Sequence, residues 1–200
     1  MKMSTTLDYY NENADAFVSG TKDVDFSEIQ SLFLSYLKDG ARILDFGCGS
    51  GRDAKLFHEK GYLVDAVDGS EELCVLAREV TGLPVQQLLF AELDCIDIYD
   101  GIWACASILH APIKELPDVF RRMITALHPD GIIYTSFKYG NGETQRGERF
   151  FSDFTEETMT DFLKQFPELQ VRKMWVTTDV RPGREEEKWL NMILQKSMLS

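Results

Sequence analysis

The sequence has few of the residues that mark a secreted, metal-binding or membrane-spanning protein. Its four cysteines are widely spaced and form no C-x-x-C pair, which predicts reduced thiols rather than disulfides or a zinc site. The three histidines show no metal-ligand spacing. No apolar run reaches the length of a membrane span, and the first residues lack the apolar region of a signal peptide. We therefore expect a cytoplasmic protein without a metal site.

Positive charge is also scarce, with 21 lysines and arginines against 33 acids and a net charge of −12. A protein that binds nucleic acid normally presents a basic surface to the phosphates, so this balance disfavours RNA and DNA as partners. It favours a small-molecule substrate or a protein side chain. The charge leaves the oligomeric state open. A hydrophobic content of 44% over 200 residues predicts one domain, residues 1–200, with a sizeable core.

The most informative stretch present is a short apolar run, 42–46, followed by alternating glycines at Gly47, Gly49 and Gly51. Such a run predicts a buried strand that feeds a tight turn, and a helix is expected over 52–60. Glycines allow the backbone to approach a ligand closely, and the N–H groups at the start of the helix point back at the loop. The pattern predicts a site that holds a small ligand against bare backbone.

The spacing of these glycines distinguishes two ligand classes. The dinucleotide fingerprint is G-x-G-x-x-G, and its third glycine position is occupied here by Arg52. The chain instead reads acid-x-G-x-G-x-G, with Asp45 as the acid. With these residues it resembles the class I S-adenosylmethionine-dependent methyltransferases, of the small bacterial type. The alternative is a tight turn between a strand and a helix in another α/β protein.

A second acid, Asp68, ends the next predicted strand, 62–67, and follows Gly47 by 21 residues. A carboxylate at this place can accept hydrogen bonds from both hydroxyls of a ribose, in a methyltransferase and in a nicotinamide enzyme alike. The alternative role, a cap for the following helix, is better filled by Gly69-Ser70.

The resemblance implies that S-adenosyl-L-methionine is the methyl donor, with S-adenosyl-L-homocysteine as the product. The implied donor site contains Tyr10, Asp45, Gly47, Cys48, Gly49, Gly51, Arg52, Asp68, Gly69, Ser70, Phe90, Ala91, Glu92, Ala106 and Ser107. Tyr10 would cover the donor from an N-terminal helix. The sequence departs from the family after the third strand, where Phe90 stands at the position of the usual adenine-binding acid. Glu92 is the candidate substitute, and a solvated loop carboxylate is the alternative.

The segment Ala106-Ser107-Ile108-Leu109-His110-Ala111-Pro112 resembles the S-x-x-L-H segment that borders the donor in many small-molecule methyltransferases, with one residue fewer between serine and leucine. His110 is a candidate general base because an imidazole titrates near neutral pH. A structural histidine bonded to the backbone is the alternative.

The segment 138–151 follows the fifth strand and contains three glycines, which predicts a mobile loop at the carboxyl edge of the sheet. We expect it to close over the site, with Tyr139 nearby and with Arg146 or Arg149 clamping an anionic group of the substrate. The alternative is a charged surface loop.

Near the C-terminal turn, Arg181-Pro182-Gly183-Arg184, a further polar cluster either faces the substrate or stabilises a hairpin; it consists of Trp175, Asp179, Arg181 and Arg184.

Alternating patterns predict an α/β fold, a Rossmann-like three-layer sandwich with a mostly parallel seven-stranded sheet and an antiparallel C-terminal hairpin. Within residues 1–40, helices are expected over 7–19 and 25–37 and would cover the donor site. Strands are expected over 42–46, 62–67, 85–90, 101–106, 131–138, 169–178 and 187–195, and further helices over 52–60, 70–80, 114–127 and 155–165.

The resemblance implies a methyltransferase that acts on a small-molecule acceptor by direct in-line transfer, with the protein supplying position and desolvation. Two alternatives remain at this point. One is a donor-binding sensor or partner subunit without catalysis. The other is a nicotinamide-dependent oxidoreductase, which Arg52 disfavours.

Overall fold

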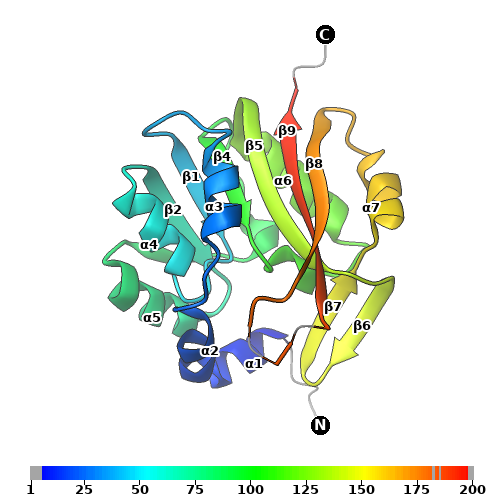
Figure 1. Cartoon of the computed structure of the whole chain (residues 1–200). Coiled ribbons are helices and arrows are strands. Elements are labelled where there is room, and N and C mark those ends of the chain that lie inside the picture. Colours follow the sequence, from blue (N-terminus) through cyan, green and yellow to red (C-terminus); the bar gives the residue numbers. More distant parts are fainter. Residues whose placement is uncertain (1–5, 182, 185, 198–200) are drawn as a thin grey trace.

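The computed structural model describes residues 6–181, 183–184 and 186–197 and consists of one mixed sheet with helices on both faces (Figure 1). The sheet has seven strands in the order β3-β2-β1-β4-β5-β9-β8. The strands are β1 (Arg42–Phe46), β2 (Leu63–Asp68), β3 (Val85–Gln87), β4 (Tyr99–Ala104), β5 (Leu127–Lys138), β8 (Leu169–Thr178) and β9 (Lys188–Lys196).

Strands β1 to β5 run parallel to one another, and β9 runs antiparallel to both β5 and β8. The predicted fold class, a Rossmann-like sandwich with an antiparallel C-terminal hairpin, is therefore confirmed. The helices are α1 (Thr6–Glu12), α2 (Ala14–Thr21), α3 (Ser27–Leu34), α4 (Arg52–Glu59), α5 (Glu71–Thr81), α6 (Leu116–Ala126) and α7 (Glu156–Leu163), with 3-10 turns η1 (Phe90–Glu92) and η2 (Ile108–His110).

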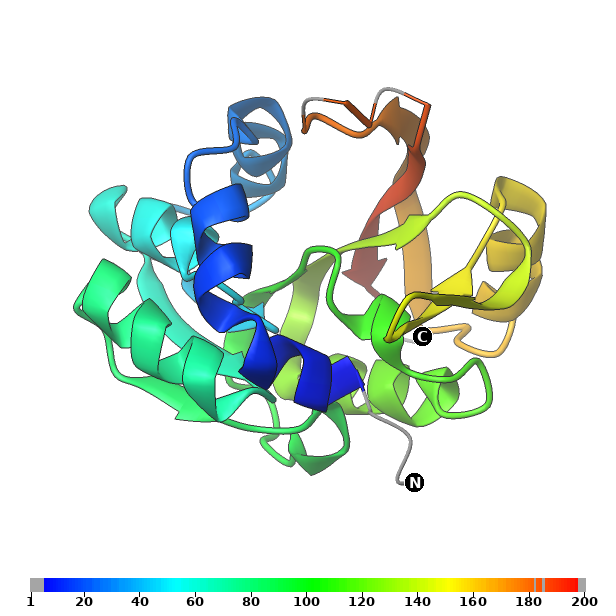
Figure 2. The ribbon, with the colours of Figure 1, turned by 90° about the horizontal axis from the view of Figure 1, so that it is seen from below.

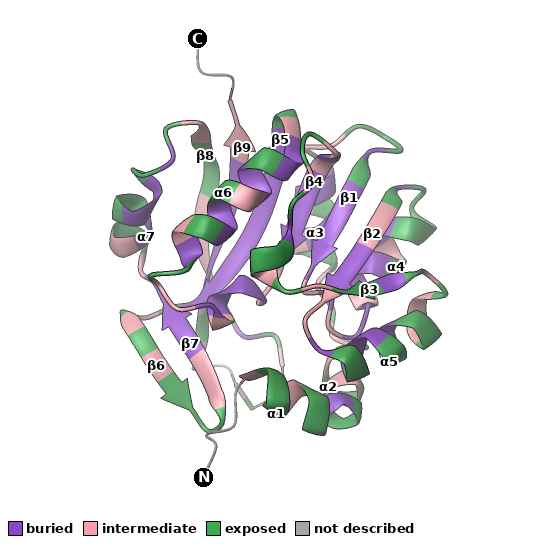
Figure 3. Ribbon diagram, turned by 180° about the vertical axis from the view of Figure 1, so that it is seen from behind, coloured by how far each residue is buried: buried purple, intermediate pink, exposed green. Residues whose placement is uncertain are grey.

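Two apolar layers sandwich the sheet, and the buried strands lie between helices whose outer sides are exposed (Figure 3). On one face, helices α3 and α4 pack aromatic side chains against the strands, and Trp103 stacks on Tyr134 with ring centroids 4.1 Å apart. On the other face, Phe120 of α6 contacts Phe162 of α7 and Phe166, which follows α7, and these rings belong to the apolar core that also buries residues of β4 and β5. Burial of these large side chains stabilises the layers by roughly 1.5–3 kcal/mol each.

The parallel strands bring their carboxyl ends to one edge of the sheet, which is where ligands bind in open α/β folds. Figure 2 looks at the molecule from below and shows α1 and α2 lying across this edge, with a small hairpin on the opposite side. The strand order reverses between β1 and β4, so the loops after these two strands diverge and leave space between them.

The predicted helix over 7–19 is wrong in one respect, because it is divided into α1 and α2 at Asn13. The Asn13 side chain donates a hydrogen bond to the Tyr9 carbonyl at 2.8 Å, and the Asn13 backbone leaves the helical region with φ −118°. Asparagine competes with helical hydrogen bonding in this way. The break lets α1 and α2 follow the curved edge of the sheet.

The predicted mobile loop over 138–151 is also wrong, because most of it forms the hairpin β6 (Gly142–Arg146) and β7 (Arg149–Asp153). Gly147 and Glu148 make a two-residue turn, and Gly147 has φ +61°, as the first position of a type II′ turn requires. The glycines thus mark turns of a hairpin instead of a structureless segment.

Other boundaries differ by a few residues. The predicted strand over 85–90 ends at Gln87, since Leu89 and Glu92 cap the turn η1. The predicted strand over 101–106 begins earlier, at Tyr99, and ends at Ala104. The predicted C-terminal turn includes Pro182, which lies outside the described residues.

Candidate functional site

A cleft of about 2080 Å³ opens at the carboxyl edge of the sheet. Its lining comes from the glycine loop after β1, the ends of β2, β4 and β5, helices α1 and α2, and the hairpins β6–β7 and β8–β9. Pockets for single small ligands occupy about 300–1,000 Å³. The cleft is therefore large enough for two ligands side by side.

The glycine loop is fixed against β2 by its own backbone. The N–H groups of Gly47 and Cys48 both donate to the Val67 carbonyl at 2.9 Å. Gly47 has φ +87°, and a Cβ atom there would lie 2.4 Å from the Cβ of Ser107. Only glycine combines this backbone angle with so close an approach. The motif therefore lets the ends of β1 and β4 meet at the floor of the cleft.

Asp68 lies beside this loop, at the end of β2, with its carboxylate already oriented. One oxygen accepts the N–H of Gly49 and the other the N–H of Ser70, each at 2.9 Å. Burial raises the pKa of Asp68, and these backbone hydrogen bonds oppose the rise. A carboxylate has about four lone-pair positions, so two remain for ligand hydroxyls.

Asp45 is 2% exposed and lies beneath the glycine loop. Its Oδ2 atom is buried and has no hydrogen-bond partner among the described residues. Burial, followed by the charge of Asp53, raises the pKa of Asp45 well above its usual range. A buried carboxyl oxygen without a hydrogen-bond partner is costly for folding alone, which is consistent with a functional position.

The N-terminal helices hold aromatic side chains over the cleft. The ring of Tyr10 contacts those of Phe17 and His110, with centroids 5.2 and 5.4 Å away. Asn11 on α1 accepts a hydrogen bond from Ser70 at 2.7 Å. Ser70 also accepts the N–H of Leu73, which confirms its predicted role as the helix cap. The cover is thus attached directly to the loop that carries Asp68.

His110 is neutral and its tautomer follows from its partners. Its Nδ1 lies 2.7 Å from the Phe150 carbonyl, which can only accept, so Nδ1 carries the proton. Its Nε2, 2.9 Å away, then accepts the Tyr10 hydroxyl. Burial lowers the pKa of His110 to about 4. The imidazole is a weak base that orients Tyr10, and its use as a general base stays a prediction.

The lowered pKa of His110 predicts that part of the free energy of unfolding is lost at acid pH. Because folding keeps His110 neutral, the unfolded chain binds more protons between pH 6.5 and 4, and stability falls as pH drops through that window. Between pH 7 and 5 the contribution lost is about 2 kcal/mol. We expect the free energy of unfolding of His110→Gln, measured in urea at pH 7 and at pH 5, to lack this decrease. Identical pH dependence in both proteins would contradict the assignment.

Another wall of the cleft comes from η1 and the loop after β4. Phe90 and Ala91 line the cleft, and the Phe90 ring contacts Phe46 with centroids 5.0 Å apart. Ala106 has the strained angle φ +50°, and its N–H donates to Ser136 Oγ at 2.9 Å. Glu92 is exposed and accepts the N–H of Leu89, so its carboxylate serves its own turn.

The two arginines predicted to clamp a substrate differ in their surroundings. Arg146 forms an ion pair with Asp153 and lies over the Phe151 ring. Arg149 lies over the rings of Tyr9 and Phe151, at 4.9 and 5.4 Å. Tyr139 is partly exposed and donates to Glu156 at 2.8 Å, which directs its hydroxyl toward α7.

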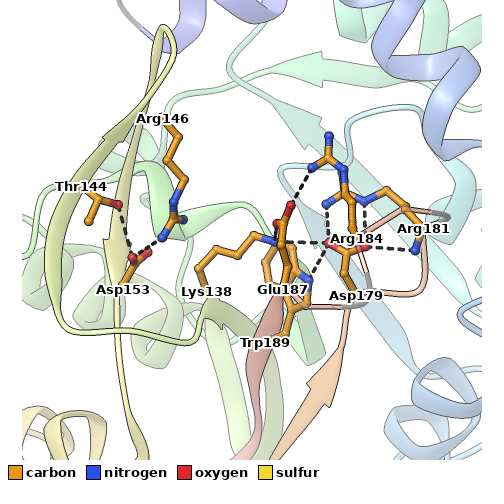
Figure 4. A network of polar contacts seen from close by, with 9 residues as sticks. All are labelled: Lys138, Thr144, Arg146, Asp153, Asp179, Arg181, Arg184, Glu187 and Trp189. Carbon is orange, nitrogen blue, oxygen red and sulfur yellow. Dashed lines mark hydrogen bonds and ion pairs between the residues drawn. The ribbon is translucent and has the colours of Figure 1, made fainter.

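A polar network forms the wall at the C-terminal hairpin (Figure 4). Lys138, 6% exposed, lies between Asp179 and Glu187 and over the Trp189 ring, with Nζ 3.9 Å from its centroid. Although burial raises it, hydrogen bonds from Arg181 and Trp189 bring the pKa of Asp179 well below its usual range. Arg184 adds an ion pair to Glu187 at 3.6 Å. Each of the three cations of this wall thus pairs with Asp179, with Glu187 or, for Lys138, with both.

Sequence reasoning missed the group that supports the glycine loop from below. Asp53, 7% exposed, accepts from Gln30 at 2.6 Å, from Trp103 at 2.9 Å and twice from Arg52. Arg52 in turn lies over the Phe26 ring at 4.8 Å. These contacts join α3, α4 and β4. The only signal in the sequence was an acid at the start of an amphipathic helix, which usually marks an exposed position.

Most of the predicted site residues meet in the one cleft. Its lining includes Tyr10, Gly47, Cys48, Gly49, Arg52, Asp68, Gly69, Phe90, Ala91, Ala106, Ser107, His110, Tyr139, Arg146 and Arg149. Asp45, Gly51, Ser70 and Glu92 do not line it. Phe17 and Lys138 also line the cleft, and so do Trp175, Asp179, Arg181 and Arg184 of the polar cluster near the C-terminal turn.

Two further properties concern the described residues only. They contain no group of three or more histidine, cysteine, aspartate or glutamate side chains arranged to hold a metal ion. None of the helices in this part of the chain combines the length and the apolar composition that spanning a bilayer requires.

The sheet order, the glycine loop after β1 and the acid that ends β2 are the features that the resemblance to the class I methyltransferases predicts. Residues 43–131 match the sequence model of a family described as the methyltransferase domain. These findings support a class I S-adenosylmethionine-dependent methyltransferase, as the resemblance implied.

Individual relatives agree with this assignment. An uncharacterized methyltransferase of Staphylococcus carnosus is 27% identical over 169 residues, which cover 74% of this chain and 77% of that protein. The provisionally named methyltransferase YqeM of Bacillus subtilis is 31% identical over 114 residues, 51% of this chain and 46% of its own length. The chain thus spans about half of the second relative.

Among solved structures, the 1,6-didemethyltoxoflavin-N1-methyltransferase of Burkholderia thailandensis has a TM-score of 0.74 at 22% identity. The match covers 94% of this chain and 84% of that one, whose structure holds 1,6-didemethyltoxoflavin and S-adenosylhomocysteine. At this identity the likeness establishes a shared fold.

Proposed function

We propose that the protein binds S-adenosyl-L-methionine in the part of the cleft formed by the glycine loop, Asp68 and η1, here called the donor half. It transfers the methyl group of this donor to a small-molecule acceptor. The observation that carries the proposal is Asp68, whose carboxylate is fixed by two backbone N–H groups beside the glycine loop. That arrangement suits the two hydroxyls of a ribose. The donor supplies an electrophilic sulfonium methyl group.

Other residues of the site fit the same ligand. Phe90, Ala91 and Ser107 form a mostly apolar wall opposite Asp68, which suits an adenine ring. The unpartnered Oδ2 of Asp45 lies beneath the glycine loop, where a positively charged ligand group on the loop would lower the pKa of its carboxyl. Tyr10 and Phe17 cover the cleft and exclude water from the transfer.

A small-molecule acceptor is supported by the shape and charge of the chain. The rest of the cleft, here called the acceptor half, is bordered by α1 and β7. The net charge of −12 opposes binding of polyanions. Contact between Thr6 on α1 and the Phe150 N–H, at 3.0 Å, closes this side.

Release of S-adenosyl-L-homocysteine tests the proposal. The protein is incubated with the donor and with a panel of small aromatic and heterocyclic acids, phenols and amines, and in parallel with transfer RNA and with a protein extract. We expect release above the acceptor-free rate with at least one small molecule. Release with RNA or protein alone would contradict a small-molecule acceptor. Donor binding without release in any arm would favour the non-catalytic sensor.

A further inference from the structure

The acceptor half of the cleft contains one arginine whose charge is not compensated. Five arginines line the cleft, and four of them form ion pairs with carboxylates, namely Arg52, Arg146, Arg181 and Arg184. Arg149 forms no ion pair with a carboxylate of the residues that the structure describes. A half-buried guanidinium in a chain with 33 acids is rarely left without a counter-ion unless a ligand supplies one.

The surroundings of Arg149 hold its guanidinium in a fixed orientation. The ring of Tyr9 lies 4.9 Å from it and that of Phe151 lies 5.4 Å from it. The Phe150 N–H donates to the Thr6 hydroxyl at 3.0 Å, which holds the strand that carries Arg149 against α1. Aromatic contacts use the faces of a guanidinium, so its remaining edge N–H groups stay available.

These observations limit the ligand to one chemical class. The edge of a guanidinium matches a carboxylate through two parallel hydrogen bonds. Arg149 supplies one positive charge at this place, which the single negative charge of a carboxylate balances. The adjacent walls are the rings of Tyr10, His110 and Phe151, which favour a flat apolar body.

We propose that Arg149 binds the carboxylate of an aromatic monocarboxylic acid, which is the acceptor or the part of the acceptor that anchors it. The inference rests on the proposed function, because it places this acid beside the donor half. Arg146, which the sequence suggested equally, is occupied by Asp153 and braces the hairpin.

The test uses benzoate as the probe, benzamide as its neutral analogue and phenylphosphonate as a dianion. Each is titrated calorimetrically into the full chain saturated with S-adenosyl-L-homocysteine. We expect benzoate to bind roughly tenfold or more tightly than either analogue, since two charge-assisted hydrogen bonds form only with the carboxylate. Arg149→Met should bind benzoate and benzamide with equal affinity. Arg149→Lys should retain only part of the preference for benzoate over benzamide.

Arg172→Met is the matched control, because Arg172 is exposed on β8 and outside the cleft lining, and it should keep the wild-type preference. Equal affinity for benzoate and benzamide in the wild type would overturn the inference, even if Arg149→Met does not fold. A preference for phenylphosphonate would replace the carboxylate by a phosphate ligand. Absence of S-adenosyl-L-homocysteine binding would instead contradict the proposed function.

Discussion

Asp68→Ala is expected to lower the affinity for S-adenosyl-L-homocysteine by roughly 100-fold or more. The carboxylate would accept both ribose hydroxyls, and hydrogen bonds to a charged group contribute about 1.5–3 kcal/mol each. The variant also loses the acceptor for the N–H groups of Gly49 and Ser70, which loosens the glycine loop. Calorimetric titration measures the affinity, and thermal unfolding confirms that the variant is folded.

A second ligand separates the direct contact from the loosened loop. An analogue of S-adenosyl-L-homocysteine without the ribose hydroxyls should bind the wild type weakly, and Asp68→Ala should weaken it little further. Such non-additivity is the signature of a direct interaction. Asp65→Ala, on the same strand, is the matched control and should bind the product normally. If the loss of binding free energy caused by Asp68→Ala and the loss caused by removing the ribose hydroxyls simply add, Asp68 acts on the loop and does not bind the ribose.

Asp53→Ala is expected to lower the free energy of unfolding by about 3–5 kcal/mol, because it leaves a buried guanidinium without its partner. Arg52, Gln30 and Trp103 all lose their acceptor in this variant. The same substitution at Asp65 breaks an ion pair with Arg42 whose side chains are 47% and 38% exposed. We expect that control to cost about 1 kcal/mol or less. Urea unfolding of both variants measures the difference, and equal losses would contradict a supporting role for Asp53.

The parts of the fold that depend on local patterns were predictable from the sequence. The strand before Gly47, the strand that ends at Asp68 and the C-terminal hairpin each have a continuous apolar or alternating pattern between turn residues. Ser70 precedes a helical pattern and is its cap in the structure. In these places, local preference and tertiary packing favour the same structure.

The remaining features depend on contacts between distant residues. The hairpin β6–β7 has polar and charged residues on both faces of β6, so no period of two indicated a strand. The break at Asn13 depends on one side chain that bonds to the backbone. The different surroundings of Arg146 and Arg149 arise because Asp153 lies across the hairpin from one of them and Tyr9 packs on the other from α1. Residue types alone carry no such information.

The central claim is that the cleft is built for S-adenosyl-L-methionine, and calorimetric titration of the protein with S-adenosyl-L-homocysteine tests it most directly, with NADH as the control. We predict micromolar binding of S-adenosyl-L-homocysteine and no binding of NADH, because Arg52 occupies the position of the third dinucleotide glycine. Binding of NADH alone, or of neither compound, would contradict the account.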